Sequence, residues 1–149
     1  MAKIKRYINP EEKKAKKTLG ETFLPSQIDT GILRKIKYEY PQNPIWIEHS
    51  SEEFTCLCPF SGLPDYAKIT VRYIPHKYCV ELRSFKYYLL SFRQVKIFHE
   101  HAVNKILQDL TALLHPREMR VEMEFNIRGG IKTKVTAEFS QEKPRYDSE

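Results

Sequence analysis

The sequence predicts an α+β fold in which an antiparallel sheet carries two helices on one face. Three stretches support this prediction: apolar and polar residues alternate over 67–73, apolar residues recur at gaps of three and four over 95–114, and alternation returns over 121–139. A period of two is typical of half-buried strands, whereas gaps of three and four place apolar side chains on one side of a helix. The expected order is strand, strand, helix, helix, strand, strand.

Two strands are expected before the helices. Residues 32–40 are rich in aliphatic and aromatic side chains and stop at a proline, and residues 67–73 alternate before a second proline. Between them, residues 54–59 run into a turn over 61–65 that contains glycine and proline. This turn separates the 54–59 segment from the second strand.

Two helices and a hairpin complete the fold. Residues 84–90 form a short amphipathic stretch, and residues 95–114 place one apolar side along a helix of about five turns. The last two strands, 121–127 and 131–139, are joined by a turn at Gly129-Gly130.

The chain has 149 residues and a mass of 17.7 kDa, which is the size of one domain. We divide it into a basic N-terminal arm or extension (1–30), a single catalytic domain (31–140) and a C-terminal tail (141–149). No stretch approaches the roughly 18 uncharged apolar residues that a membrane span needs, and the first residues lack the apolar core of a secretory signal. We therefore expect a cytoplasmic protein.

The net charge of +6 lies mostly at the N-terminus. Residues 1–20 hold seven Lys or Arg and two Glu, so the rest of the chain carries a net charge of only +1. A lysine-rich arm is usually solvated, although it could contact a polyanion nonspecifically. A broad nucleic-acid-binding face on the domain is not expected.

Three cysteines, Cys56, Cys58 and Cys79, are an odd number in a chain without an export signal, so we expect free thiols. His76 could join them as the fourth ligand of a zinc ion. The Cys-x-Cys spacing is shorter than that of a usual zinc knuckle, however. No metal is therefore expected.

Cys58 differs from the other two because it precedes Pro59 in a turn-rich segment. An exposed cysteine with a lowered pKa is a nucleophile. Asp65 follows seven residues later, at the end of a loop that can fold back, so the two could act as nucleophile and proton donor. From spacing alone, a free cysteine and a turn aspartate without chemistry are the commoner combination.

Polar residues also begin both helices. His99 and Glu100 near the start of the long helix could point into a cleft, where the carboxylate would accept two N–H donors from the Watson–Crick edge of a purine. They could equally be a charge in the first helical turn and a surface histidine. Glu81, Arg83 and Lys86 on their own indicate only a solvated helix start.

Taken together, four blocks carry a resemblance over roughly residues 20–140. They are residues 54–59 (FTCLCP) with Gly62-x-Pro64-Asp65, residues 80–88 (VELRSFKYY), residues 91–93 followed by 98–100 (SFR and FHE), and Arg128-Gly129-Gly130. The chain resembles the short, single-module form of the NADPH-dependent 7-cyano-7-deazaguanine reductases, the nitrile reductases of queuosine biosynthesis. The second block fits the family signature E-(S/L)-K-(S/A)-h-K-(L/Y)-(Y/F/W), except that Arg83 replaces a lysine.

The resemblance implies the tunnelling fold, which this family shares with GTP cyclohydrolase I and 6-pyruvoyltetrahydropterin synthase. In that fold, two strands, two helices and two further strands pack as oligomeric barrels. Active sites lie between subunits, so we expect a homo-oligomer whose isolated monomer is inactive. Neither a membrane nor a nucleic acid is expected as a partner.

The resemblance also implies a four-electron reduction of the nitrile to the amine of 7-aminomethyl-7-deazaguanine, with two NADPH. Cys58 would form a covalent thioimidate, Asp65 would supply a proton, and His99 would assist. The residues expected to bind the substrate are Val80, Glu81, Leu82, Phe98, His99 and Glu100. Those expected to bind NADPH are Arg83, Lys86 and Arg128.

Two alternatives belong to other functional classes. A related group of tunnelling-fold proteins shares the cysteine and aspartate but acts as an amidinotransferase on the same nitrile within archaeal tRNA. The other alternative is a non-catalytic module that binds a purine or RNA, for which the basic arm would matter most.

Overall fold

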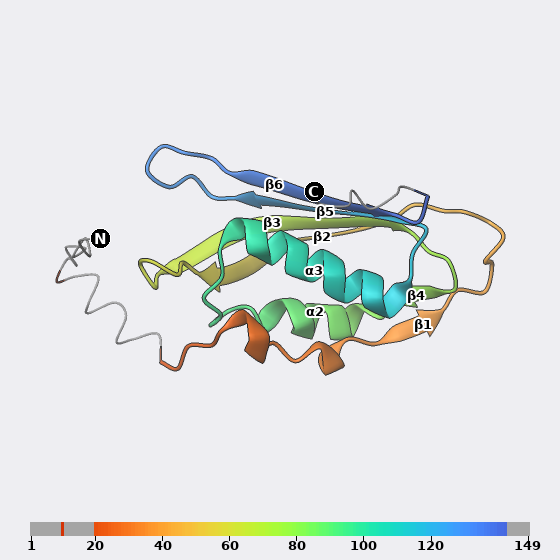
Figure 1. The fold of residues 1–149 in the computed structure, drawn as a ribbon, viewed down its shortest axis with the longest axis horizontal. Helices are drawn as coiled ribbons and strands as arrows, with labels where there is room; N and C mark the ends of the chain where they lie inside the picture. The colour runs from red at the N-terminus through yellow and green to blue at the C-terminus, as the bar shows by residue number, and fades with distance from the viewer. Residues whose placement is uncertain (1–9, 11–19, 143–149) are drawn as a thin grey trace, which may run out of the picture.

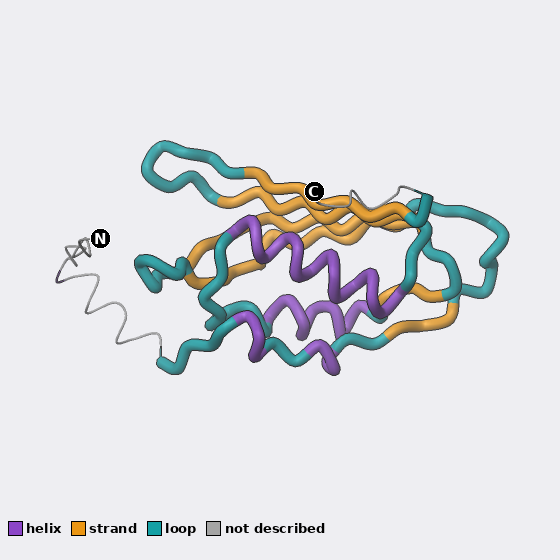
Figure 2. The backbone as a smooth tube through the Cα atoms, in the orientation of Figure 1, coloured by secondary structure: helices purple, strands orange, loops and turns teal. Residues whose placement is uncertain are grey.

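A four-stranded antiparallel sheet, in the order β2-β3-β5-β6, forms one layer of the molecule, and two helices cover one of its faces (Figures 1 and 2). The computed structural model describes residue 10 and residues 20–142. The sheet and its helices are β2 (Ile47–Leu57), β3 (Pro64–Ile74), α2 (Leu82–Leu90), α3 (His99–Leu114), β5 (Glu118–Phe125) and β6 (Lys134–Ser140). Their order confirms the predicted α+β class.

The core lies between the sheet and the two helices. Along β3, buried and exposed residues alternate from Asp65 to Tyr73, and the buried set faces the helices. Tyr88 on α2 reaches α3, because its hydroxyl donates to Asp109 Oδ2 at 2.6 Å, and Lys105 Nζ contacts the same oxygen at 2.9 Å. Burial, followed by the hydrogen bond and charge of Asp109, raises the pKa of Tyr88. This polar contact fixes the two helices against each other.

The prediction for the first two strands was partly wrong. Within residues 32–40, only β1 (Lys35–Lys37) is a strand, and it pairs with β4 (Tyr78–Val80) in a separate two-stranded sheet. On one side β3 pairs with β2, and on the other with β5. The sequence analysis did not predict β2 as a strand, and it overlooked the first half altogether. That half is polar and half-exposed, and a bulge sets two residues of β2 against one of β3 between Ser51 and Phe54. The alternation of apolar and polar residues that predicts a strand is therefore not visible in this part of the sequence.

The long helix also begins later than its spacing predicts. Val95 and Ile97 are buried but extended: Leu57 N donates to Val95 O at 2.8 Å, and Ile97 N donates to Leu57 O at 3.1 Å. The helix starts at His99. Residues 95–97 thus attach the end of β2 to the start of α3.

The segment before β1 packs on the domain where the structure describes it. Phe23 forms a bridge with Val95, Ile28 and Leu33 are buried, and two short 3-10 helices, η1 (Pro25–Gln27) and η2 (Thr30–Ile32), lie between them. The basic cluster at 1–20 falls almost wholly outside the described residues, as does most of the 141–149 tail.

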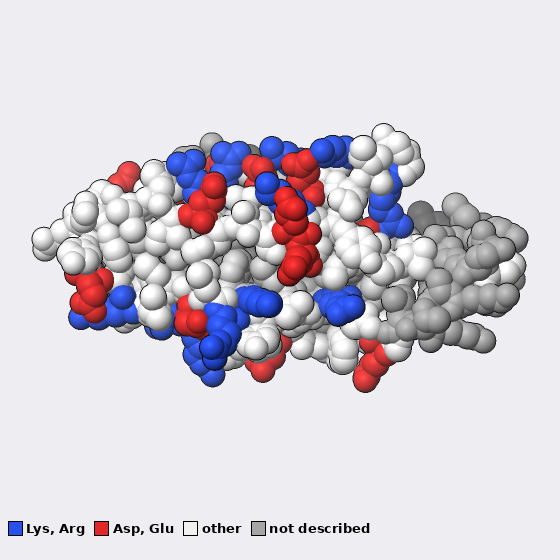
Figure 3. All heavy atoms as spheres, turned by 180° about the vertical axis from the view of Figure 1, so that it is seen from behind, with Lys and Arg blue, Asp and Glu red and all other residues white. Residues whose placement is uncertain are grey.

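Charges of both signs interleave on the face seen from behind in Figure 3, where they gather over β5 and β6. Arg120 contacts both Glu122 and Glu138, and Lys134 contacts Glu122 at 3.1 Å. These ion pairs balance the charges of both signs over β5 and β6. Among residues 20–142, no helix is long and apolar enough to cross a bilayer.

Candidate active site

Cys58 lies in the tight loop that joins β2 to β3, at one end of the sheet. Cys58 N donates to Leu63 O at 2.9 Å, and Gly62 N donates back to Cys58 O at 2.7 Å. Gly62 has a φ of 70°, a left-handed conformation that residues with a Cβ adopt at a cost. The loop therefore folds back as the sequence predicts and holds Cys58 half-exposed.

The thiol of Cys58 is activated by its own loop. Burial raises its pKa, but hydrogen bonds from the Ser61 hydroxyl and from the backbone N–H groups of Ser61 and Phe60 outweigh burial. The negative charge of Asp65 opposes them weakly, and the net effect lowers the pKa. Ser61 is buried and was not recognised from the sequence, although its position three residues after the cysteine was a usable signal.

The other two cysteines lack this activation. Burial, followed by the charges of Asp65 and Cys58, raises the pKa of Cys56 to about 12. Burial also raises the pKa of Cys79, despite a hydrogen bond from Tyr73. All three thiols are free. Cys58 is therefore the one with nucleophilic character.

Asp65 is the centre of a polar cluster beside that loop. It begins the inner face of β3, directly opposite Cys56, and is 3% exposed. His99 Nε2 lies 3.1 Å from Asp65 Oδ2, and Arg128 Nη1 donates to Asp65 Oδ1. Residues that are 34 and 63 positions away in sequence thus meet at one buried carboxylate.

His99 is held in place by stacking. Its ring lies parallel to that of Phe125, with ring centroids 3.6 Å apart, at the end of β5. Phe98, before it, is part of an exposed aromatic group: its ring packs edge-on against Phe60 at 5.5 Å and against His101 at 5.7 Å. Glu100 is exposed in the first turn of α3. Predicted residues Phe98, His99 and Glu100 therefore cluster at the end of the sheet that carries Cys58.

The predicted residues Val80, Glu81 and Leu82, on β4 and at the start of α2, lie at the other end of the sheet (Figure 1). Tyr73 donates from its hydroxyl to Cys79 and contacts Val80 N at 3.1 Å, which fixes β4 near the far end of β3. Asp65 and Tyr73 are eight residues apart on that strand, or about 26 Å at 3.3 Å per residue. Val80, Glu81 and Leu82 are thus not brought together with Cys58 within one chain.

Glu81 has a structural role that the sequence analysis did not foresee. Its carboxylate caps α2, accepting from Arg83 N at 2.9 Å and from Ser84 N at 2.8 Å. These two backbone hydrogen bonds lower the pKa of Glu81, and the bond from Ser84 has the larger effect. A carboxylate fixed at a helix start is rigid and ionised, and it keeps lone pairs for further donors.

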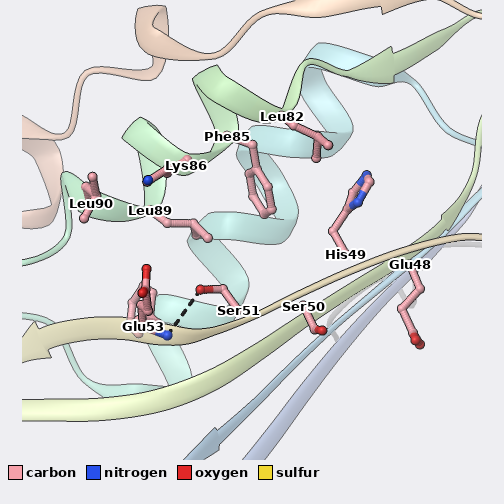
Figure 4. Close-up of a pocket in the computed structure, with 11 residues that line it drawn as sticks. Glu48, His49, Ser50, Ser51, Glu53, Leu82, Phe85, Lys86, Leu89 and Leu90 are labelled. Atoms are coloured by element: carbon pink, nitrogen blue, oxygen red, sulfur yellow. Dashed lines mark hydrogen bonds between the residues drawn. The ribbon is translucent and has the colours of Figure 1, made fainter.

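Arg83 and Lys86 lie exposed on α2. Lys86 also lines an open groove of about 440 Å³ between α2 and β2 (Figure 4). The other lining residues are Glu48, His49, Ser50, Ser51, Glu53, Phe54, Leu82, Phe85, Leu89 and Leu90. Since none of Cys58, Asp65 and His99 lines this groove, it is separate from the Cys58 cluster. Arg128, which was predicted to bind NADPH with Arg83 and Lys86, contacts Asp65.

The described residues contain no group of three or more His, Cys, Asp or Glu side chains arranged to hold a metal ion. His76 therefore does not complete a metal-binding group with the three cysteines in this part of the chain. The chemistry available at the Cys58 end comes from a thiol, a carboxylate and an imidazole.

Comparisons with known proteins agree on one family. The family described as "QueF-like protein" matches residues 64–144. An NADPH-dependent 7-cyano-7-deazaguanine reductase of Caldicellulosiruptor bescii is 55% identical over 77% of this chain and 88% of its own length. A protein of that name from Thermoanaerobacter pseudethanolicus is 48% identical over 87% of this chain and 98% of its own length.

A solved structure shows the same fold. The apo form of the archaeosine synthase QueF-Like superposes with a TM-score of 0.58 and 25% sequence identity. The match covers 68% of this chain and 96% of the other.

Proposed function

The chain belongs to the QueF-like family, and from this membership we propose that it is an NADPH-dependent 7-cyano-7-deazaguanine reductase of queuosine biosynthesis. It reduces the nitrile to the amine of 7-aminomethyl-7-deazaguanine. The observation that carries the proposal is the selective activation of Cys58 among three thiols, beside the Asp65–His99 pair.

The first step is addition of Cys58 to the nitrile. The sulfur forms a bond to the nitrile carbon, one carbon–nitrogen π bond breaks, and the nitrogen takes a proton from Asp65, assisted by His99. The product is a covalent thioimidate. A thiolate suits this step because the nitrile carbon is a soft electrophile, and the lowered pKa of Cys58 favours the thiolate form.

Two equivalents of NADPH supply the hydrides for the four-electron reduction. Arg83 and Lys86 fit such a ligand because both are exposed cations on α2, and Lys86 lies at the rim of a groove large enough for part of a dinucleotide. Arg83, although it replaces the family lysine, keeps the charge and can bind a phosphate through two N–H groups. We assign these two residues to the 2′-phosphate.

The substrate ring is bound by carboxylates and aromatic rings. Glu100 accepts N–H donors from its guanine-like edge, and Phe98 and His99 contact the ring from the same end of the sheet. Glu81, with the backbone of Val80 and Leu82, completes the pocket from a neighbouring subunit. Two features support the shared pocket: the separation of about 26 Å along β3 within one chain, and the edge positions of β2 and β6, which can pair with other copies.

Two measurements on the same protein test the activity. We expect NADPH oxidation that depends on the nitrile, together with a mass increase equal to one substrate in the intact protein. Cys58→Ala should lose both, whereas Cys56→Ala and Cys79→Ala should keep both. An adduct of normal abundance in Cys58→Ala would contradict the assignment of Cys58 as the nucleophile.

A mixing experiment tests the shared pocket. Cys58→Ala and Lys86→Glu should each be inactive alone. If one subunit supplies Cys58 and its neighbour supplies Lys86, randomly mixed oligomers regain about a quarter of the sites, because each intact residue is present with a chance of about one half. Mixtures that stay inactive would place both residues in one subunit's site.

The amidinotransferase alternative has one observation in its favour, the structural likeness to an archaeosine synthase. Sequence relatives at 44–55% identity carry the reductase name, however. Adduct formation without any NADPH oxidation would favour the transferase.

A cytoplasmic location remains part of the proposal, since three free thiols suit a reducing compartment.

A further inference from the structure

Tyr73 is a fully buried tyrosine whose hydroxyl has two polar partners. The hydroxyl accepts from Val80 N at 3.1 Å and donates to the sulfur of Cys79. Tyr73 is 0% exposed and Val80 is 4% exposed, so water does not reach the hydrogen bond between them. This bond therefore links the end of β3 to β4 through the core.

The residue that follows Val80 is Glu81, and its backbone is also held in place. Glu81 N donates to Arg34 O at 2.9 Å, and Ser84 Oγ donates to Glu81 O at 2.7 Å. Those partners belong to the segment before β1 and to α2. The hydrogen bond from Val80 to Tyr73 joins the same stretch of chain to the four-stranded sheet. The position of Glu81 thus depends in part on a side chain that does not touch it.

We propose that Tyr73 is a positioning residue for Glu81 and thereby sets the substrate affinity of the pocket that Glu81 completes. The inference rests on the proposed function, in which Glu81 serves the Cys58 of a neighbouring subunit. Asp65 and Tyr73 lie on the same buried face of β3, near its opposite ends. One strand then positions groups for two pockets, Asp65 for that of its own Cys58 and Tyr73 for that of a neighbour.

Replacing Tyr73 with phenylalanine removes one oxygen atom and keeps the ring. Val80 N–H then loses its acceptor in a site that water does not reach, and β4 shifts until this group finds another partner. A carboxylate displaced with it meets the N–H donors of the substrate at poorer distances and angles. The groups around Cys58 in the same subunit are unchanged. Substrate binding should therefore weaken, while the addition of the sulfur keeps its rate.

Adduct formation without NADPH, followed by intact mass over a range of nitrile concentrations, separates these two effects. The half-saturating concentration reports binding, and the maximal rate reports the addition step. In Tyr73→Phe we expect the half-saturating concentration to rise about five- to tenfold, as for one buried donor left without a partner. The maximal rate should stay within about twofold. An unchanged half-saturating concentration, or a loss confined to the maximal rate, would overturn the inference.

Tyr88→Phe is the matched control. Tyr88 is also fully buried and loses a hydrogen bond, but its hydroxyl contacts Asp109 on α3. This variant should be less stable and keep the wild-type half-saturating concentration. An equal rise in Tyr88→Phe would show that the effect is a general loss of stability, against the proposal.

Two further variants test the route through Glu81. In a Glu81→Gln background, Tyr73→Phe should raise the half-saturating concentration by less than about twofold, because the group that it positions is already altered. Full additivity would contradict the route. Replacing Val80 with its α-hydroxy analogue puts an ester oxygen in place of the N–H, so it removes the donor and keeps Tyr73. This variant should show the same rise as Tyr73→Phe, and it decides the matter if Tyr73→Phe does not assemble.

Mixed oligomers test whether the effect crosses the subunit boundary. Tyr73→Phe subunits are assembled with an excess of Cys58→Ala subunits, so that most of the remaining Cys58 side chains have a neighbour with an intact Tyr73. The adduct forms only on the Tyr73→Phe chains, and its half-saturating concentration should return to the wild-type value. A value that stays raised would place the effect within one subunit and refute the proposal. If the wild-type protein forms no adduct at all, the proposed function fails instead, so the two failures are distinguishable.

Discussion

Replacing Ser61 with alanine tests the origin of Cys58 reactivity. The Ser61 hydroxyl donates to the sulfur, and this hydrogen bond is the largest of the influences that lower the pKa of Cys58. A hydrogen bond to a charged group contributes about 1.5–3 kcal/mol. At neutral pH we therefore expect Ser61→Ala to form the thioimidate about 10- to 100-fold more slowly than the wild type.

The sign of the pH dependence follows from the same argument. The thiolate is the reactive form, so the adduct rate falls as the pH falls through the pKa of Cys58. Ser61→Ala raises that pKa, and its profile should move to higher pH. At a pH where both thiols are ionised, the variant should react nearly as fast as the wild type.

The assay is stopped-flow or quenched mixing with the nitrile in the absence of NADPH, read by intact mass across a range of pH. Recovery at high pH serves as the internal control, since Ser61 Oγ also accepts a weak bond from Leu63 N at 3.2 Å, and a distorted loop would slow the reaction at every pH. A change smaller than about twofold at neutral pH would refute the reasoning.

The remaining predictions concern cofactor, substrate and stability. Lys86→Ala should raise the KM for NADPH at least about tenfold and leave adduct formation unchanged, as steady-state and single-turnover kinetics would show. Glu100→Gln should weaken substrate binding by about 1–3 kcal/mol, or about 5- to 150-fold in Kd, and unchanged calorimetric affinity would contradict its role. Tyr88→Phe, which removes the donor to Asp109 between α2 and α3, should lower the unfolding free energy by about 1–3 kcal/mol in urea, with kcat preserved; equal stability would show that the contact is dispensable.

Much of the fold was predictable because β3, α3 and β5 each bury one face, and the apolar residues of that face recur at regular spacing in the sequence. β2 was harder, since an edge strand with a bulge at Ser51 to Phe54 shows polar residues where a central strand would alternate. The start of α3 was displaced for a related reason: Val95 is buried through strand-like contacts, and its spacing to Phe98 and Ala102 also fits a helix.

In the candidate site too, residues that are close in sequence could be predicted together, whereas contacts between distant residues could not. Cys58 and Asp65 were identifiable because they belong to one loop and one motif. The contact between Arg128 and Asp65 was not, because it depends on a hairpin that meets Asp65 from 63 residues away. Glu81 as a helix cap is a local feature that the motif obscured, since the resemblance pointed to substrate binding at the same residue.

Because the three thiols differ in acidity, alkylation can be used to count the active sites of a preparation that are able to react. A thiol-specific alkylating reagent at neutral pH should consume one equivalent per chain, at Cys58, while Cys56 is shielded by burial and a pKa of about 12 and Cys79 by its own raised pKa. The equivalents consumed then measure the fraction of a preparation that is able to react. Rates per chain can in this way be corrected to rates per working site, without mutating the other cysteines.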